Sequence, residues 1–409
     1  MSENFRTKNV LEKFNITRQT LYNWIKSGEI TAPEVDWRGW RIWTKTQINE
    51  INSLINKKNK EKIKNKKTYV NNNGFEINNR RYLGSKYKLL GFIQDVVNEN
   101  CTNINTVSDI FAGTGSVAYH FNKNGKRVIV NDILLSNYTS YEAWFSSENV
   151  NIQKISNILE ELNNINNYNE NYVSINFGGK YFSKENSLKI GAIREEIEKL
   201  NQVVNSREKS ILLTSLMYAT DKCANTCGHY DAYRRKLDTL EPIKLLMPKE
   251  ILIKENEGNE IYRKDANQLV KELNVDLTYI DTPYNSRQYG DAYHLLENII
   301  EWKKPKVEGV ARKMVERGSI KSAYCTVKAP KMFDELINNI NSRYILVSYN
   351  NMAQKGVGRS NAKISNEEII ETLNRVGKVK IFDIDYKAFT TGKTSLEGHK
   401  ELLYLCECK

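Results

Sequence analysis

A carboxylate, a rigid turn and an aromatic ring directly follow one apolar stretch of the chain. The stretch is Leu277–Ile280, and it runs into Asp281, Thr282, Pro283 and Tyr284. We expect the apolar residues to form a buried strand. Open α/β sheets bind ligands at the carboxyl ends of their strands. The pattern therefore predicts that Asp281 and Tyr284 face a ligand site.

A glycine-containing turn between a predicted strand and a predicted helix is the second candidate element. Glycines are required where a side chain would block the approach of a ligand to the backbone. The next predicted strand ends in an acidic residue roughly 20 positions on, where a ribose would be hydrogen-bonded. The residues concerned are Asp109, Phe111, Gly113, Gly115 and Asp132. They indicate a nucleoside cofactor, and the incomplete three-glycine fingerprint disfavours NAD; a plain strand–helix turn is the alternative.

Three segments of the chain, in the order in which they occur, resemble motifs of the Dam-type adenine-specific (N6) DNA methyltransferases. The family motif [Asp/Asn/Ser]-Pro-Pro-[Tyr/Phe/Trp] corresponds to Asp281-Thr-Pro-Tyr284, and "DIFAGTGSVA" and "RRYLGSKYKLLGFI" stand upstream. The resemblance spans about residues 80–409 and is nearest to restriction–modification members of the FokI-methyltransferase kind. The chain departs from the family at position 282, where Thr replaces the first Pro. Because the family uses the main-chain carbonyl there, the change affects the rigidity of the turn more than the chemistry.

The resemblance implies methyl transfer from S-adenosylmethionine to the N6 amine of an adenine that is flipped out of duplex DNA. Asp281 and the carbonyl of residue 282 would accept the two amine hydrogens, and Tyr284 would stack on the base. The expected catalytic residues are therefore Asp281, Pro283 and Tyr284. No cysteine follows a proline in the chain, which excludes a cytosine-C5 methyltransferase.

The resemblance also assigns the cofactor-binding residues. Lys86 would pair with the carboxylate of the methionine part, and Asp132 would bind the ribose hydroxyls. Asp265 would meet the adenine amino group; the alternative is that it only caps the helix predicted after it. The complete expected set is Tyr82, Lys86, Asp109, Phe111, Gly113, Gly115, Asp132, Asp265 and Asp281.

Residues 140–262 contain long polar helices, and we expect this helical insert to recognise the target sequence. Its run from Asp221 to Arg235 mixes basic and aromatic residues, resembles a DNA-facing stretch of the FokI-like members and suits phosphate and base contacts. A structural loop is the alternative. The expected DNA-contacting residues are His229, Tyr230, Tyr233, Arg234 and Arg235, with Arg287 beyond the catalytic turn. Cys223, Cys227 and His229 form only an incomplete zinc half-site, so we expect no metal.

Residues 1–55 predict a separate DNA-binding unit. Apolar spacing predicts helices near residues 10–14 and 17–25, with Thr17 as the N-cap of the second, then a hairpin at 36–43 and a helix at 47–55. The segments "TRQTLYNWIKSGEI" and "GWRIWT" resemble the MerR-like and excisionase-like winged helix-turn-helix, whose second helix enters a major groove. The expected contacts are Arg18, Tyr22 and Arg38. A protein-interaction module of the same shape is the alternative.

Alternating strands and helices from residue 80 indicate an α/β fold, a Rossmann-like methyltransferase sheet that is mostly parallel and covered on both faces. We expect strands at 106–111, 127–132, 277–280 and 344–348, with a final pair at 379–384 and 402–406. The expected division is a winged helix-turn-helix domain at 1–55, a Lys/Asn-rich linker at 56–79, a catalytic domain at 80–139 and 263–409, and the insert at 140–262.

The 409-residue chain carries a formal net charge of +12, which favours a polyanionic partner such as double-stranded DNA. No apolar run reaches the roughly 20 residues of a membrane span, and the first residues lack the apolar core of a signal peptide. Six cysteines are too few for a disulfide framework in a chain of this length. We expect a cytoplasmic protein with reduced thiols, which acts as a monomer and has no membrane partner.

The function expected first is site-specific N6-adenine DNA methylation, as the modification half of a restriction–modification system with a cognate restriction endonuclease encoded separately. A non-enzymatic DNA-binding regulator on a methyltransferase scaffold is the alternative from another class. The intact Asp281 motif and glycine turn argue against it. Methylation of cytosine N4 or of RNA adenine is harder to exclude, since those enzymes share the motif in outline.

Overall fold

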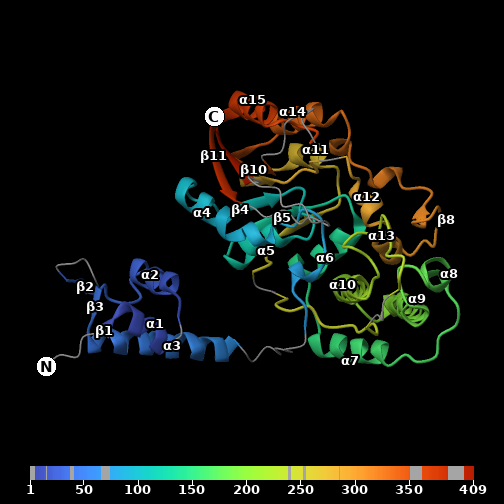
Figure 1. Ribbon diagram of the computed structural model, residues 1–409, viewed down its shortest axis with the longest axis horizontal. Coiled ribbons are helices and arrows are strands. Elements are labelled where there is room, and N and C mark those ends of the chain that lie inside the picture. The colour runs from blue at the N-terminus through green and yellow to red at the C-terminus, as the bar shows by residue number, and fades with distance from the viewer. Residues whose placement is uncertain are drawn as a thin grey trace. The chain divides into compact units, whose positions relative to one another are not determined.

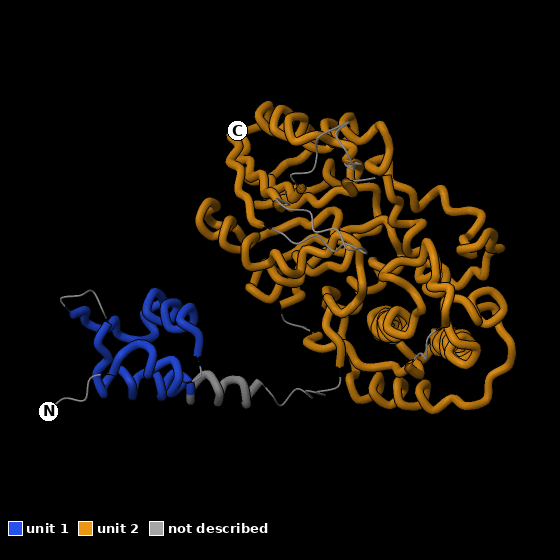
Figure 2. The backbone as a smooth tube through the Cα atoms, in the orientation of Figure 1, with its two compact units in different colours: residues 1–72 blue, residues 73–409 orange. Residues whose placement is uncertain are grey.

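The computed structural model describes residues 5–14, 16–36, 41–65, 74–237, 241–251, 255–284, 286–350, 362–385 and 400–409. The chain divides into two units, Met1–Asn72 (unit 1) and Asn73–Lys409 (unit 2), which Figure 2 shows in separate colours. Each unit has its own buried apolar core.

Unit 1 contains three helices and a small sheet with the strand order β1-β3-β2. Its elements are β1 (Phe5–Arg6), α1 (Thr7–Phe14), α2 (Arg18–Lys26), β2 (Glu34–Val35), β3 (Arg41–Trp43) and α3 (Lys45–Asn65). The Thr17 side chain caps α2, as predicted, by accepting a hydrogen bond from the Thr20 amide. Val10, Leu21 and Trp43 are buried at the centre. The order of elements matches the expectation, and the resemblance to a winged helix stays a prediction.

Unit 2 is built on a seven-stranded sheet with the order β11-β12-β10-β7-β4-β5-β6. The strands are β4 (Thr106–Asp109), β5 (Arg127–Asn131), β6 (Glu260–Tyr262), β7 (Val275–Ile280), β10 (Ser342–Asn350), β11 (Gly377–Asp385) and β12 (Lys400–Cys408). Neighbours from β6 to β10 pair in parallel, and β12 runs antiparallel to both β10 and β11. The predicted mostly parallel sheet and its final strand pair are confirmed.

Helices cover both faces of the sheet (Figure 1). The described helices of unit 2 are α4 (Leu90–Asn100), α5 (Ser116–Lys123), α6 (Leu135–Phe145), α7 (Ile152–Asn163), α8 (Tyr172–Phe177), α9 (Lys184–Lys199), α10 (Ser206–Lys222), α11 (Ala266–Leu269), α12 (Tyr289–Ala292), α13 (His294–Glu301), α14 (Ala329–Asn338) and α15 (Asn366–Val376). Short 3-10 turns are η1 (Ile77–Asn79), η2 (Tyr87–Leu89), η3 (Leu200–Gln202), η4 (Val270–Glu272), η5 (Gly318–Ile320) and η6 (Ala323–Cys325), and a small hairpin joins β8 (Val307–Glu308) to β9 (Lys313–Met314).

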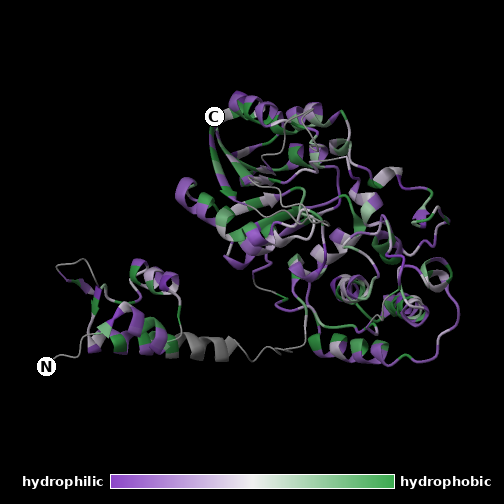
Figure 3. Cartoon of the chain, in the orientation of Figure 1, coloured by the Kyte–Doolittle hydropathy of each residue, from purple (hydrophilic) through white to green (hydrophobic). Residues whose placement is uncertain are grey.

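The alternation of side chains along the strands explains why both faces are covered. In β10, Tyr344 and Leu346 join the core under α4, α5 and α6, whereas Ile345 and Val347 join the core under α14 and α15. Figure 3 shows apolar residues concentrated in the strands and polar residues on the outer sides of the helices. A strand that is apolar on both faces has to be buried on both.

The chain crosses from one side of β4 to the other, and this crossing creates the ligand-binding edge. After β4 the chain continues into β5 on one side, and it later returns to β7 on the other. The carboxyl ends of these three strands are adjacent, and they lead into Asp109, Asp132 and Asp281. Such a topological switch point is where open α/β sheets bind ligands.

The expected linker at 56–79 is wrong at both of its ends. Helix α3 continues to Asn65, and the stretch that follows residue 73 packs into unit 2. Phe75 and Ile77 are buried in the core, and the Phe75 backbone hydrogen-bonds to Met247 and Lys249. Phe75 and Ile77 bury this end of the segment in the core of unit 2, although the average composition of the segment predicts disorder.

The helical insert is also more closely integrated than the sequence predicts. Helix α10 packs against α6, α9 and α13, and α13 follows the catalytic motif rather than lying within 140–262. The buried Arg194 of α9 donates from Nε to the carbonyl oxygen of Ile299 in α13 at 2.8 Å. The helices therefore form one layer with part of the catalytic region.

Candidate active site

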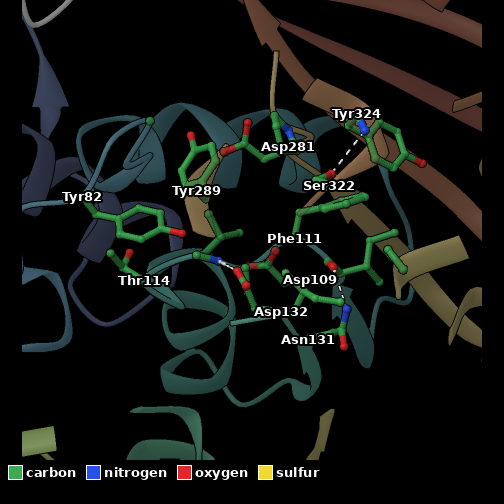
Figure 4. Close-up of a pocket in the computed structure, with 18 of the residues that line it drawn as sticks. Tyr82, Asp109, Phe111, Thr114, Asn131, Asp132, Asp281, Tyr289, Ser322 and Tyr324 are labelled. Carbon is green, nitrogen blue, oxygen red and sulfur yellow. Dashed lines mark hydrogen bonds between the residues drawn. The ribbon is translucent and has the colours of Figure 1, made fainter. Parts of the chain in front are cut away.

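A cavity opens at the carboxyl ends of β4, β5 and β7 (Figure 4). Aromatic rings and carboxylates from distant parts of the chain surround it. The predicted residues that line it are Tyr82, Lys86, Asp109, Phe111, Gly113, Asp132, Asp265, Asp281 and Pro283. The fold thus brings the predicted cofactor-binding residues, apart from Gly115, together around this cavity.

The glycine turn between β4 and α5 depends on glycine at two positions. Gly113 has φ +54° and Gly115 has φ +80°, a region that residues with a Cβ rarely adopt. A Cβ on Gly113 would lie 2.9 Å from Cε1 of Tyr82. A Cβ on Gly115 would lie 3.1 Å from the Tyr141 ring, away from the cavity. Gly113 therefore shapes the cavity wall, and Gly115 allows close packing behind it.

Two carboxylates, the buried Asp109 and the partly buried Asp132, face the cavity from β4 and from the end of β5. Asp132 Oδ2 accepts a hydrogen bond from the Gly113 amide at 3.1 Å, and its Oδ1 accepts one from the Leu134 amide at 2.9 Å. Asp109 Oδ2 accepts one from the Ala118 amide at 3.3 Å, whereas its buried Oδ1 has no protein partner in the described residues. Burial raises the pKa of both carboxyls, and the nearby Asp281 adds to the rise for Asp109.

Tyr82 forms an aromatic wall that its neighbours hold in place. Its ring stacks on Tyr293 with centroids 4.5 Å apart, and the Arg80 guanidinium lies 4.8 Å from its centroid. The Asn137 side chain donates a hydrogen bond to the Tyr82 hydroxyl at 3.1 Å. The position of Tyr82 is therefore fixed before any ligand arrives.

Asp265 and Phe111 also line the cavity. Asp265 caps α11 by accepting a hydrogen bond from the Gln268 amide at 3.2 Å, and it also lines the cavity. The capping alternative is thus correct, and a ligand contact through the rest of its carboxylate stays a prediction. The Phe111 ring meets Tyr324 edge to face with centroids 5.1 Å apart.

The catalytic turn follows β7 and places the Asp281 carboxylate at the top of the cavity in Figure 4. Burial raises the pKa of Asp281 to about 6, partly opposed by the cationic Lys86. Pro283 lines the cavity. The Thr282 side chain is buried, and the Tyr284 ring lies 6.3 Å from the ring of Tyr349. Tyr284 is not among the cavity-lining residues of the described chain, so its stacking role stays a prediction.

Lys86 pairs with two protein carboxylates. Its ammonium group is 2.8 Å from Asp281 Oδ1, 2.9 Å from Asp281 Oδ2 and 3.3 Å from Glu401 Oε1. It also donates to the carbonyl of Gly84 at 3.3 Å. The lysine lines the cavity as expected and its charge is paired with protein carboxylates. The predicted pair with a ligand carboxylate stays a prediction.

Sequence reasoning missed the segment that closes the cavity beside the catalytic turn. Ser322 and Tyr324, from residues 318–325, line the cavity with Tyr289. The Gln288 amide group pairs with the Ser322 backbone: Nε2 donates to its carbonyl at 3.0 Å and Oε1 accepts from its amide at 2.7 Å. Tyr324 donates to Asn267 Oδ1 at 2.7 Å. No local motif marks this segment, because long-range contacts position it.

The residues predicted to contact DNA are placed differently from one another. In unit 1, Arg18 and Tyr22 are exposed on α2, and Arg38 lies outside the described residues. In unit 2, Arg234 and Arg235 are exposed. Tyr233 is partly buried, with its ring edge to face against Tyr181 at 5.2 Å.

Tyr230 requires a correction. Its side chain is fully buried, and its hydroxyl donates a hydrogen bond to Asp221 Oδ1 at 2.9 Å. It therefore supports the helical layer and does not face a duplex in this structure. His229 is partly buried, 3.7 Å from Asp231, and burial together with Arg287 lowers its pKa. Arg287 Nε lies 3.8 Å from the same carboxylate.

Within the described ranges, no group of three or more His, Cys, Asp or Glu side chains is arranged to hold a metal ion. Cys223 is buried and Cys227 is exposed. In the part of the chain that the structure describes, no helix is both long and apolar enough to cross a membrane.

Comparisons with known proteins agree with this geometry. Residues 82–355 match the family described as D12 class N6 adenine-specific DNA methyltransferase. The type II methyltransferase M.NlaIII from Neisseria lactamica is 31% identical over 334 residues, which cover 78% of this chain and 95% of that protein. Two further relatives are each 31% identical to this chain. The match to the modification methylase LlaI from Lactococcus lactis subsp. lactis covers 79% of this chain, and the match to the type II methyltransferase M.FokI from Planomicrobium okeanokoites covers 80% of it. The match covers 53% and 52% of those two proteins, so the chain spans about half their length.

Proposed function

Because the chain belongs to the D12 class N6 adenine-specific DNA methyltransferases, we propose that it methylates adenine within one specific sequence of duplex DNA. The proposed methyl donor is S-adenosylmethionine. The proposed biological role is the modification activity of a restriction–modification system with a separately encoded endonuclease, as the names of its relatives suggest. The observation that carries the proposal is the meeting of Asp109, Asp132 and Asp281 at one cavity beside a glycine turn.

The side chains that line the cavity suit the chemical groups of S-adenosylmethionine. We assign the ribose hydroxyls to Asp132, which lines the cavity, and the amino-acid part to Asp109, whose Oδ1 has no hydrogen-bond partner in the described residues. Aromatic faces from Tyr82 and Phe111 suit a sulfonium cation and an adenine ring. The cofactor supplies an electrophilic methyl group. The protein's own task is to hold the acceptor amine against it.

Asp281 is the proposed acceptor for that amine. The lone pair of an adenine amine is delocalised into the ring, which makes the nitrogen a poor nucleophile. Hydrogen bonds from its two hydrogens, to Asp281 and to the main-chain carbonyl of Thr282, favour a tetrahedral nitrogen that can attack. An amine that accepts a methyl group must lose one proton, and the Asp281 carboxylate that accepts its hydrogen bond could take that proton. Fixed polar groups of this kind are worth about 2.7–4 kcal/mol each.

The adenine has to leave the duplex to reach Asp281. We assign the stacking face to Tyr284, whose ring is braced by Tyr349 and whose carbonyl accepts a hydrogen bond from the Lys363 amide at 3.0 Å. Aromatic stacking of an extruded base is worth about 1–3 kcal/mol. A braced ring loses little freedom when the base arrives.

We assign target recognition to residues 140–262 and extra DNA affinity to unit 1. The exposed Arg234 and Arg235 of the insert suit phosphate contacts. The exposed Arg18 and Tyr22 lie on α2, the helix that would enter a major groove if the unit binds as a winged helix.

The test is a methyl-transfer assay with labelled S-adenosylmethionine and duplex DNA, followed by nucleoside analysis. We expect label in N6-methyladenine and in a single sequence context. Label in N4-methylcytosine, or label only in RNA, would overturn the proposal. The Asp281→Ala variant, purified in the same way, controls for contaminating methyltransferases.

A further inference from the structure

Lys86 is a buried cation between two carboxylates, Asp281 after the central strand β7 and Glu401 on β12, two strands away in the sheet. Its side chain is 8% exposed, and that of Glu401 is also 8% exposed. The ammonium group lies 2.8 Å from Asp281 Oδ1 and 3.3 Å from Glu401 Oε1. Asp281 faces the cavity, whereas Glu401 is not among the cavity-lining residues of the described chain. Glu401 is therefore linked to the cavity by its contact with Lys86.

Strand pairing and a side-chain contact hold Glu401 in place. It lies near the start of β12, where the strand pairs with Asn350 of β10 and with Ile384 of β11. The Ser348 hydroxyl is 3.3 Å from Glu401 Oε1 and donates a hydrogen bond to it. A glutamate fixed on both sides by strands presents its carboxylate to Lys86 at a constant position.

The charges explain why a second carboxylate is useful. A buried lysine with one carboxylate partner would pair with it as closely as possible, because an uncompensated buried charge is costly. The ammonium group contacts both Asp281 oxygens, at 2.8 and 2.9 Å, and each of these oxygens has a further lone pair. Glu401 contacts the same ammonium group at 3.3 Å and shares its charge, so the remaining lone pairs of Asp281 stay available for another donor.

We propose that Glu401 is a positioning residue for methyl transfer: it shares the Lys86 ammonium group and so keeps the Asp281 carboxylate available to accept hydrogen bonds from the target amine. This inference rests on the proposed role of Asp281. The proposal gives a residue of β12 a function in the site at the carboxyl ends of β4, β5 and β7.

The same arrangement sets how the reaction responds to pH. Burial raises the pKa of Asp281, Lys86 opposes the rise, and the Glu401 charge adds to it. Burial lowers the pKa of Lys86, but Asp281 and Glu401 outweigh it and hold the lysine protonated. The other titratable groups that face this cluster are Tyr279 from β7, Asp109 from β4 and Tyr289 from α12. Removing the Glu401 charge should therefore lower the pKa of Asp281.

The experiment compares Glu401→Gln with the wild-type full-length enzyme in steady-state kinetics from pH 5 to pH 8. We expect kcat to fall by about 10- to 100-fold, because the acceptor is misplaced, while the KM for S-adenosylmethionine changes little. We also expect the acid limb of the kcat/KM profile to move to lower pH. A purely structural defect would reduce the active fraction and would leave the acid limb in place.

Two further variants make the result decisive. Glu407→Gln removes the same charge from an exposed position on β12, and we expect wild-type kinetics. Glu401→Asp keeps the charge but withdraws the carboxylate by one methylene, so kcat should fall without a shift of the acid limb. If Glu401→Gln does not fold, Glu401→Asp decides by its kcat alone.

A wild-type kcat in either folded Glu401 variant overturns the proposal. So does an acid limb that stays in place when the charge is removed. Activity in Asp281→Ala would instead contradict the proposed function itself, so the two failures are distinguishable.

Discussion

Replacing Gly113 with alanine tests whether the glycine turn and Tyr82 form one rigid wall of the cofactor cavity. At φ +54°, a Cβ costs about 1–2 kcal/mol in backbone strain. The same Cβ would lie 2.9 Å from Cε1 of Tyr82. The stacked Tyr293 and the Asn137 hydrogen bond leave that ring little room to move. Overpacking of this kind adds about 1–3 kcal/mol, so we expect Gly113→Ala to lose about 2–5 kcal/mol in total.

Gly125→Ala is the matched control. Gly125 also has a positive φ, +77°, but a Cβ there would meet nothing within 4 Å. This variant should lose only the backbone term of about 1–2 kcal/mol. Urea unfolding of both variants gives the difference in stability, and calorimetry with S-adenosylmethionine gives the effect on the cavity.

We expect Gly113→Ala to bind the cofactor more weakly and Gly125→Ala to bind it normally. Equal stability losses in the two variants, together with unchanged cofactor affinity in Gly113→Ala, would refute the reasoning. The Tyr82 contact would then contribute nothing to the site.

Three other outcomes are expected. The pKa of Asp281 is raised to about 6, and we expect only the ionised carboxylate to accept the hydrogen bonds of the target amine. The kcat/KM should therefore fall as the pH drops below about 6, and a flat profile down to pH 5 would contradict this. Asp132→Ala should weaken cofactor binding in calorimetry without weakening DNA binding, and unchanged cofactor affinity would mean that the ribose site is wrong. A chain that starts at residue 72 should methylate the same sequence, with weaker and less salt-sensitive DNA binding in gel-shift titrations; a changed or relaxed target sequence would move recognition to unit 1.

The strand ends that carry the site could be predicted from the sequence because the pattern there is local. Apolar runs that end in Asp109, Asp132 and Asp281 lead to the carboxyl edge of a parallel sheet whatever the rest of the chain does. The strand β6, by contrast, was missed. It contains only Glu260, Ile261 and Tyr262, all partly exposed, which is too short a run to show any periodicity.

The partners of single side chains could not be predicted in this way. Lys86 was expected to meet a ligand, but Asp281, 195 residues further on, and Glu401 bring their carboxylates to it only after the sheet has formed. Tyr230 stands in a run of basic and aromatic residues that indicates a DNA-facing surface. Its burial depends on Asp221, which accepts its hydroxyl hydrogen within the helical layer. Composition shows which residues gather in a segment, and it does not show which of them the fold turns inward.

Single-turnover methyl transfer by Asp281→Ala tests the central claim most directly. The measurement uses enzyme in excess over a duplex with one target site, with labelled S-adenosylmethionine and a parallel DNA-binding titration. If Asp281 accepts the hydrogens of the target amine, the rate should fall by at least ~10² while DNA affinity stays within a few-fold of the wild type. A wild-type rate in a variant that still binds DNA would contradict the account, because the methyl acceptor would then not depend on this carboxylate.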